Sequence, residues 1–354
     1  MTRIGSTWLT DKSAYDVWVE EQGIGRIVDY HIPDLMAVPL KPWERRGGNG
    51  VFLNLIGTED TNDAYLCEIP AGGSLKPERH LYEELVYVLA GRGATEVWSG
   101  DGAKPVSFEW QAGSLFAIPL NASARHHNAS GTQSARFLAV TSAPLMINLL
   151  NDLEFVFNCE HDFARRFSGD DDYFSGQGVM HGERVWESNF VSDVRTMKLV
   201  PRSSRGGDMN VQLELADGAL ASHISEMPAG RYKQAHRHGP GAHVIILSGQ
   251  GYSLMWPDGG EPRRFDWQAG SMIVPPDMWW HQHFNTGAEP ARYLALRWGS
   301  NKHHVFKRYT GDVSAREGGN QIDFADQDPS VHDDYASELA RNGVPLALRP
   351  PTAG

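Results

Sequence analysis

The sequence contains two copies of one pattern, and this internal repeat constrains the fold more than any other feature. The heptapeptide Phe108–Ser114 returns with a single conservative change as Phe265–Ser271. Two further pairs of segments show the same spacing to within one residue: Glu68–Gly72 with Glu226–Gly230, and Ala135–Ala139 with Ala291–Ala295. A match of this length predicts two consecutive copies of one fold.

Each copy consists of short runs of β-branched, aromatic and aliphatic residues that Gly and Pro interrupt at close intervals. This pattern is typical of an all-β sandwich or barrel. Helix signals occur only near the ends, where Asp11 or Ser13 is the expected cap of a short N-terminal helix and Pro329–Arg341 predicts a C-terminal one. The repeat predicts three parts: an N-terminal barrel in residues 1–160, a C-terminal barrel in 161–320, and a helix and tail in 321–354.

The charge balance argues against nucleic acid as a partner. Lys and Arg number 32 against 44 Asp and Glu, which gives a formal charge of −12 without a basic stripe. No apolar run approaches the length of a membrane span. Charges at Asp11, Lys12 and Asp16 interrupt any signal-peptide core, and Cys67 and Cys159 are too few for a disulfide framework. We therefore expect a cytoplasmic protein without nucleic-acid or membrane partners.

Histidines concentrate in the second copy. His236 and His238 are two residues apart, so on a strand both side chains project from one face. A second pair with the same spacing, His281 and His283, follows about forty residues later. If the two strands lie side by side in a barrel, His281 adds a third imidazole to one metal ion.

This arrangement resembles the two motifs of the cupin family, whose fold is a jelly-roll β-barrel. Gly230, His236 and His238 match the first motif. The second motif matches at four positions: Gly270, Pro276, His281 and Asn285. The sequence departs from the family at Met278, where the second motif has Gly, and at Ala242, where the first motif has its Glu ligand.

The resemblance therefore implies two tandem cupin barrels, with His236, His238 and His281 holding a metal without a carboxylate. Imidazoles suit Fe, Zn, Cu and Ni, and open positions on iron suit an organic chelate together with dioxygen. Among cupins, the pattern is similar to the gentisate 1,2-dioxygenase and salicylate dioxygenase group of bicupins. This implies an Fe(II)-dependent dioxygenase that uses dioxygen to cleave a C–C bond of a small aromatic or enolic substrate such as a hydroxy-aromatic acid.

Other readings stay open at the level of sequence. Zn, Mn or Ni in place of iron indicates a non-oxidative isomerase, lyase or hydrolase, and a bicupin that only binds a small ligand is a further alternative. The family also implies a homodimer or homotetramer. His283 is the candidate catalytic acid or base, or a buried structural residue, while His243 is either an extra ligand or an outward neighbour of Ala242. The candidates for lining the substrate pocket are Arg297, Tyr252, Trp256, Trp279 and Trp280.

The first copy has an altered site. Its aligned residues are Glu78 for His236, His80 for His238 and Ala124 for His281, while Glu84 keeps the carboxylate position that the second copy lost. Glu78, His80 and Glu84 form a possible weak second metal site. The favoured interpretation is a degenerate cupin kept for packing, because Ala124 removes one ligand.

Overall fold

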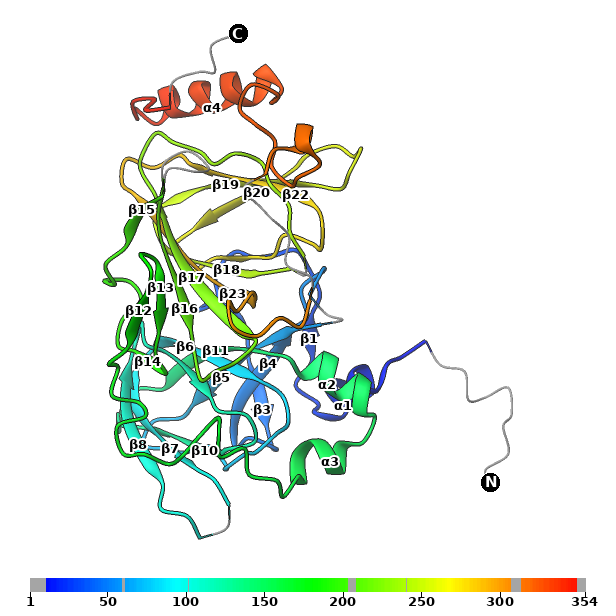
Figure 1. Cartoon of the computed structure of the whole chain (residues 1–354), viewed down its shortest axis with the longest axis vertical. Coiled ribbons are helices and arrows are strands. Elements are labelled where there is room, and N and C mark those ends of the chain that lie inside the picture. The colour runs from blue at the N-terminus through cyan, green and yellow to red at the C-terminus, as the bar shows by residue number, and fades with distance from the viewer. Residues whose placement is uncertain are drawn as a thin grey trace.

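The computed structural model describes residues 11–58, 61–100, 102–202, 208–239, 241–306 and 313–348. Two β-barrels lie one above the other along the long axis of the molecule (Figure 1), with the N-terminal copy below and the C-terminal copy above. The architecture confirms the expected all-β class with few short helices. Among the described residues, no helix is long and apolar enough to cross a membrane.

The first barrel pairs one large sheet, in the order β1-β4-β5-β11-β6-β9-β14 with β3 beside β4, with a three-stranded sheet β10-β7-β8. The strands of its half of the chain are β1 (Arg26–Ile27), β2 (His31–Ile32), β3 (Lys41–Trp43), β4 (Gly48–Leu53), β5 (Asp63–Ile69), β6 (Glu84–Ala90), β7 (Arg92–Trp98), β8 (Val106–Gln111), β9 (Leu115–Ile118), β10 (Ser123–Asn128) and β11 (Ala135–Thr141).

The second barrel repeats this plan, with a large sheet in the order β12-β13-β16-β17-β23-β18-β21-β2, β15 beside β16, and a three-stranded sheet β20-β19-β22. Its half of the chain contains β12 (Val179–His181), β13 (Val185–Glu187), β14 (Phe190–Val191), β15 (Val200–Arg202), β16 (Asp208–Glu214), β17 (Leu220–Met227), β18 (His243–Ser248), β19 (Gln250–Trp256), β20 (Arg263–Gln268), β21 (Met272–Ile273), β22 (Trp280–Asn285) and β23 (Ala291–Trp298).

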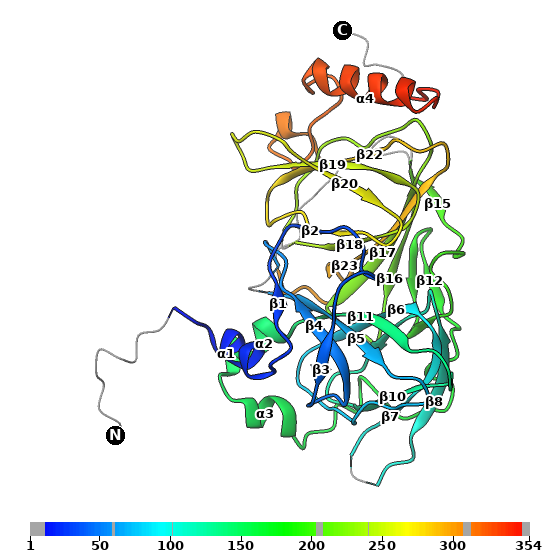
Figure 2. The same ribbon diagram turned by 180° about the vertical axis from the view of Figure 1, so that it is seen from behind.

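Each barrel receives one strand from the other half of the chain. Strand β2, from the N-terminal half, pairs with β21 of the second barrel, and Figure 2 shows it beside that barrel. Strand β14, from the C-terminal half, pairs with β9 of the first barrel. The sheets therefore do not follow the expected division of the sequence near residue 160, because one strand from each side of it pairs with the barrel on the other side.

The large sheets of the two barrels share one apolar core. Leu138 and Leu66 of the first barrel belong to the same buried cluster as Leu294, Leu296 and Ile245 of the second. Because side chains alternate along a strand, the intervening residues of the same strands point into their own barrel. This alternation decides which residues of β18, β22 and β23 can reach the candidate site.

The predicted terminal helices are present. The N-terminal helix α1 (Ala14–Glu21) is capped by Ser13, which forms a capping box with Asp16. The C-terminal helix α4 (Pro329–Arg341) has the predicted bounds and covers the outer face of the β20-β19-β22 sheet through Tyr335 and Leu339. Two short helices that the sequence analysis did not identify, α2 (Ala143–Leu150) and α3 (Leu153–Asn158), lie beside α1 in Figure 1.

Candidate metal centre

The second barrel brings His236, His238 and His281 together. His236 lies in the segment before β18, and its backbone exchanges two hydrogen bonds with His281 of β22, at 3.0 and 2.8 Å. One ring nitrogen of each histidine lies within 4.8 Å of those of the other two. Within the described ranges, this trio is the one group of at least three His, Cys, Asp or Glu residues close enough to hold a metal ion.

Backbone carbonyl groups orient two of the three rings. His236 Nδ1 lies 3.0 Å from the carbonyl oxygen of Gln234, and His281 Nδ1 lies 3.1 Å from that of Trp279. A carbonyl accepts only, so each Nδ1 carries the hydrogen and each Nε2 keeps its lone pair. Both rings are nearly buried, with exposures of 5% and 1%. The donor set fits a dication that accepts imidazole nitrogen.

Among the described residues, no carboxylate joins the trio. Ala242 occupies the position of the expected family Glu, and it packs with Val244, Ile273 and Ala295 in the apolar core of the second barrel. The ligands that the described residues supply are therefore three imidazoles, and a dication bound by them alone would keep its full charge.

His283 points into the same barrel as His281, because the two residues are two positions apart on β22. Their ring centroids are 5.6 Å apart. His283 Nδ1 lies 2.7 Å from Ser253 Oγ, and the Trp267 indole donates to the same hydroxyl at 3.0 Å.

The first barrel contains the same network. His126 Nδ1 lies 2.7 Å from Thr95 Oγ1, to which Trp110 donates at 2.9 Å. A network that also occurs in a barrel without the histidine trio favours a structural role for His283 over the predicted catalytic one.

His243 does not join the metal ligands. It pairs with Leu296, and directly opposed residues in a sheet share a face, so His243 faces the core between the two barrels. Its side chain is fully buried, and burial lowers the pKa of His243 to about 3. The outward alternative is therefore correct, and the extra-ligand alternative is wrong.

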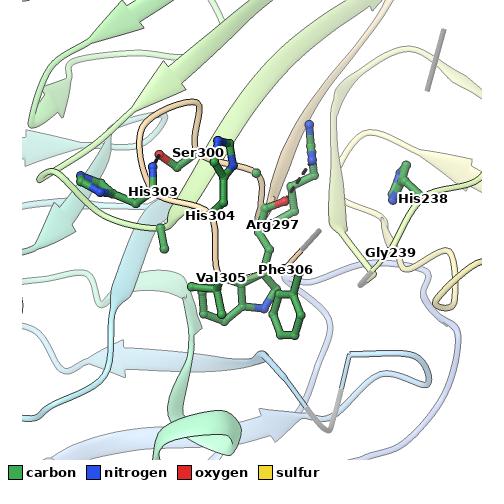
Figure 3. A pocket seen from close by; sticks show the side chains of 11 residues that line it. His238, Gly239, Arg297, Ser300, His303, His304, Val305 and Phe306 are labelled. Atoms are coloured by element: carbon green, nitrogen blue, oxygen red, sulfur yellow. Dashed lines mark hydrogen bonds between the residues drawn. The ribbon is translucent and has the colours of Figure 1, made fainter. Parts of the chain in front are cut away.

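A pocket opens beside the trio and contains Arg297, as predicted (Figure 3). It encloses about 460 Å³, including solvent at its mouth. Figure 3 shows Arg297 between His238 on one side and His303 and His304 on the other. The described residues of its lining include no carboxylate. Arg297 Nε also lies 3.4 Å from His223 Nδ1 inside the barrel.

The predicted aromatic lining of the pocket is wrong. Ser253 and Met255 of β19 face His283 and His281, so the alternating Tyr252 and Trp256 point out of the barrel. Tyr252 stacks on Phe284 at 4.4 Å beneath helix α4.

Trp280 also lies on the outer face, because it adjoins His281 on the same strand. Its indole donates to Asp258 at 3.1 Å, and Arg237 lies over its ring at 4.4 Å. Trp279 contacts Tyr30, with ring centroids 5.7 Å apart, and is absent from the described lining of the pocket.

The first barrel holds an arginine where a weak metal site was a possibility. Glu78 forms ion pairs with Arg45, at 2.5 Å, and with the buried Arg46. Glu84 accepts from Tyr65 at 2.5 Å and pairs with His80 at 2.8 Å. The guanidinium of Arg46 supplies the positive charge that these carboxylates require, which favours the interpretation of a degenerate barrel.

Burial alone would raise the pKa of Glu84. The hydrogen bond and charge of His80, together with the charge of Arg46, instead lower that pKa to about 2. Glu84 therefore remains ionised inside the first barrel.

The sequence analysis missed several polar residues on the inner wall of the second barrel. His223, Tyr293, Lys233 and Asp208 lie there and contact one another or Arg297. Tyr293 and Arg297 are four residues apart on β23 and therefore share a face, so strand alternation could have identified Tyr293 from the predicted Arg297. The pairing of Lys233 with Asp208 joins residues from separate segments, and no local pattern indicates it.

The comparisons with known proteins agree with this architecture. Residues 65–141 match the model of the cupin domain. A structure of Bacillus subtilis oxalate decarboxylase, from a study of its Mn(II) centres, has a TM-score of 0.51 at 14% identity and covers 92% of this chain and 88% of its own. A variant of that enzyme with Trp replaced by Phe gives a TM-score of 0.52 with the same identity and coverage.

No curated protein sequence is similar enough to this chain to count as a match. The structural likeness extends over nearly the whole chain, and at this identity it shows the fold alone. The chain thus has the fold of two tandem cupin barrels, with a match to the cupin domain in the first.

Proposed function

We propose that the protein is a metal-dependent enzyme whose second barrel binds one divalent cation through His236, His238 and His281. The observation that carries this proposal is the convergence of three imidazole nitrogens within 4.8 Å. Carbonyl groups hold two of the rings in the tautomer that a metal ligand needs. A bound dication would supply Lewis acidity toward an oxygen atom of the substrate.

The reaction we favour is non-oxidative, as in a lyase, and the substrate is a small organic anion. The chain shares its fold with oxalate decarboxylase, an enzyme whose Mn(II) centres have been studied. This likeness supports a non-oxidative reaction over a dioxygenase reaction. Arg297 lines the pocket together with three histidines, and a guanidinium binds a carboxylate well, which favours a carboxylate ligand in the pocket. Arg297 would bind and orient that carboxylate beside His238.

An Fe(II)-dependent dioxygenase acting on a hydroxy-aromatic acid is the second candidate. Ala242 favours it, because three neutral imidazoles leave the cation with open positions and its full charge. Oxygen uptake distinguishes the two reactions, since a lyase reaction consumes no dioxygen.

The test begins with metal content. Protein purified anaerobically without a His tag is analysed for Fe, Mn, Zn, Ni and Co, and is compared with His281→Ala. The matched control is His181→Ala, because the His181 side chain is 54% exposed and lies on β12, outside the trio. We expect about one equivalent in the wild type and the control, and none in His281→Ala.

The metal-loaded protein is then incubated with small carboxylic and hydroxy-aromatic acids while dioxygen and carbon dioxide are monitored. Product formation without oxygen uptake supports the non-oxidative reaction, and stoichiometric uptake supports the dioxygenase. Absence of metal in the wild type, or its retention in His281→Ala, would overturn the proposed centre.

A further inference from the structure

A buried group of three polar residues, Lys233, Asp208 and Tyr293, lies on the inner wall of the second barrel. The Lys233 ammonium donates to Asp208 Oδ2 and, at 2.7 Å, to the hydroxyl oxygen of Tyr293. The exposures of the three residues are 3%, 2% and 8%. Burial would lower the pKa of Lys233, but Tyr293 and Asp208 together raise it, so the lysine keeps its charge.

The first barrel has apolar residues at all three positions. The repeat aligns Lys233 with Leu75 and Tyr293 with Phe137. The repeat aligns Glu226 with Glu68. Met209 pairs with Glu226 and Asn49 pairs with Glu68, so the residues just before them, Asp208 and Gly48, correspond.

In the first barrel, a Cβ on Gly48 would lie 2.8 Å from Leu75 Cδ2, so the glycine leaves room for the leucine. The two positions are therefore neighbours in both barrels, since Asp208 contacts Lys233 in the second. The fold therefore does not require a polar group at these positions. A buried ion pair also adds little stability over apolar residues of similar volume. Since the polar group occurs only in the barrel that holds the histidine trio, we relate it to the chemistry of that barrel.

The contacts of Tyr293 fix the direction of its hydroxyl. The phenolic oxygen already accepts from Lys233, whose ammonium cannot accept in return. The hydroxyl hydrogen therefore requires another acceptor, and the described residues provide none for it. A buried donor without an acceptor is costly, so an oxygen atom inside the barrel is the expected partner.

Tyr293 lies on the same inner wall of the barrel as His283 and His281. Its ring centroid lies 5.7 Å from that of His283, which in turn lies 5.6 Å from that of His281. On the other side, its ring centroid lies 6.0 Å from that of His223, which contacts Arg297. The phenol thus lies between the candidate metal ligands and the arginine of the pocket.

We propose that the Tyr293 hydroxyl donates a hydrogen bond to an oxygen atom of the anionic substrate at the metal centre, and that Lys233 is the positioning residue that directs this hydroxyl. The inference rests on the proposed function and deepens it. The substrate class is a small carboxylate with a second oxygen atom, so that one oxygen binds the cation while another accepts from Tyr293.

The test uses the full-length protein loaded with Co(II), whose visible absorption reports ligands that join the metal. Acetate is the probe, and its dissociation constant is measured from the spectral change. Tyr293→Phe removes only the hydroxyl and introduces the residue that the first barrel has at this position. We expect acetate to bind about tenfold more weakly, since a hydrogen bond to a charged group is lost, with Co(II) stoichiometry unchanged.

A second variant tests the positioning role. Lys233→Met combined with Asp208→Asn removes both buried charges together and keeps the phenol. We expect weaker acetate binding here as well, because the hydroxyl is then free to rotate, with unchanged metal content. Tyr65→Phe is the matched control, since it removes a buried hydroxyl from the first barrel, and we expect wild-type acetate binding.

The outcomes separate this inference from the proposed function. If the wild type binds no Co(II), the metal centre itself is wrong. If it binds Co(II) and Tyr293→Phe binds acetate as the wild type does, the centre stands and the role of Tyr293 is overturned. Loss of Co(II) from Tyr293→Phe would also contradict the inference, because it would assign Tyr293 to metal binding.

Discussion

Arg46 forms an ion pair with Glu78 inside the first barrel. Glu78 occupies the position that aligns with the metal-ligand candidate His236 in the second barrel. The guanidinium is 3% exposed and also interacts electrostatically with Glu84. The first barrel thus contains a positively charged side chain, Arg46, near its altered site. The second barrel instead contains the three imidazoles of the trio.

Replacing Arg46 is expected to destabilise the protein. Arg46→Met leaves the half-buried Glu78 with Arg45 alone and removes the positive charge near the buried Glu84. It should cost about 3 kcal/mol of unfolding free energy, because it leaves buried negative charge poorly compensated. Chemical denaturation measures the loss. Arg45→Met is the matched control, since its side chain is 33% exposed, and it should cost about 1 kcal/mol or less. Equal losses in the two variants would contradict the special role of Arg46.

A carboxylate at position 242 is expected to change the metal preference of the second barrel. In the first barrel Glu84 reaches His80, and these residues align with Ala242 and His238. Ala242→Glu should therefore bring an anionic oxygen to the trio and increase the preference for Mn(II) over Zn(II), because carboxylates suit the harder ion.

Competitive metal binding, with both ions present, tests this change. Ala242→Gln is the control of similar size without the charge, and it should keep the wild-type preference. The expectation fails if the two variants have the same preference.

Acid should destabilise the protein through Glu84. Its pKa is about 2 in the folded state against 4.5 in the reference state, so folding favours the ionised form. The stability that this contributes, about 3 kcal/mol, is present above pH 4.5 and decreases as the pH falls toward 2. Denaturation of the wild type and Glu84→Gln across this range measures the difference, which should shrink with falling pH. A constant difference would show that Glu84 does not titrate as described.

His283 and His126 are expected to respond alike to substitution. Alanine at either position leaves the hydroxyl of Ser253 or Thr95 without its histidine partner in a buried site. Each substitution should cost about 1–3 kcal/mol of unfolding free energy. Elemental analysis should find the metal content unchanged in both variants. Loss of metal from His283→Ala alone would instead identify His283 as a ligand.

The repeat and the spacing of the histidines were sufficient to predict two barrels and the trio. Alternation on β22 correctly separates His281 and His283 from their neighbours. The same rule places Trp280 outside the barrel, because Trp280 adjoins the inward His281. It also places Tyr252 outside, because Tyr252 adjoins Ser253, which faces His283. The wrong prediction came from expecting aromatic residues near a histidine in sequence to share its cavity.

Other features depend on contacts between distant segments. Arg46 reaches Glu78 from a different part of the chain, and Lys233 reaches Asp208 and Tyr293 on two strands that the sequence separates. Strand alternation identifies the face of each residue, but it does not identify which inward residues meet. The buried charge pairs therefore required the three-dimensional structure.

The exchange of β2 and β14 makes the two barrels dependent on each other for folding. A fragment that ends between the repeats would keep β2 without β21 and would leave β9 without β14. Each fragment would then present a bare sheet edge, a surface prone to aggregation. We expect the two fragments expressed together to complete one another's sheets, because each carries the strand that the other lacks.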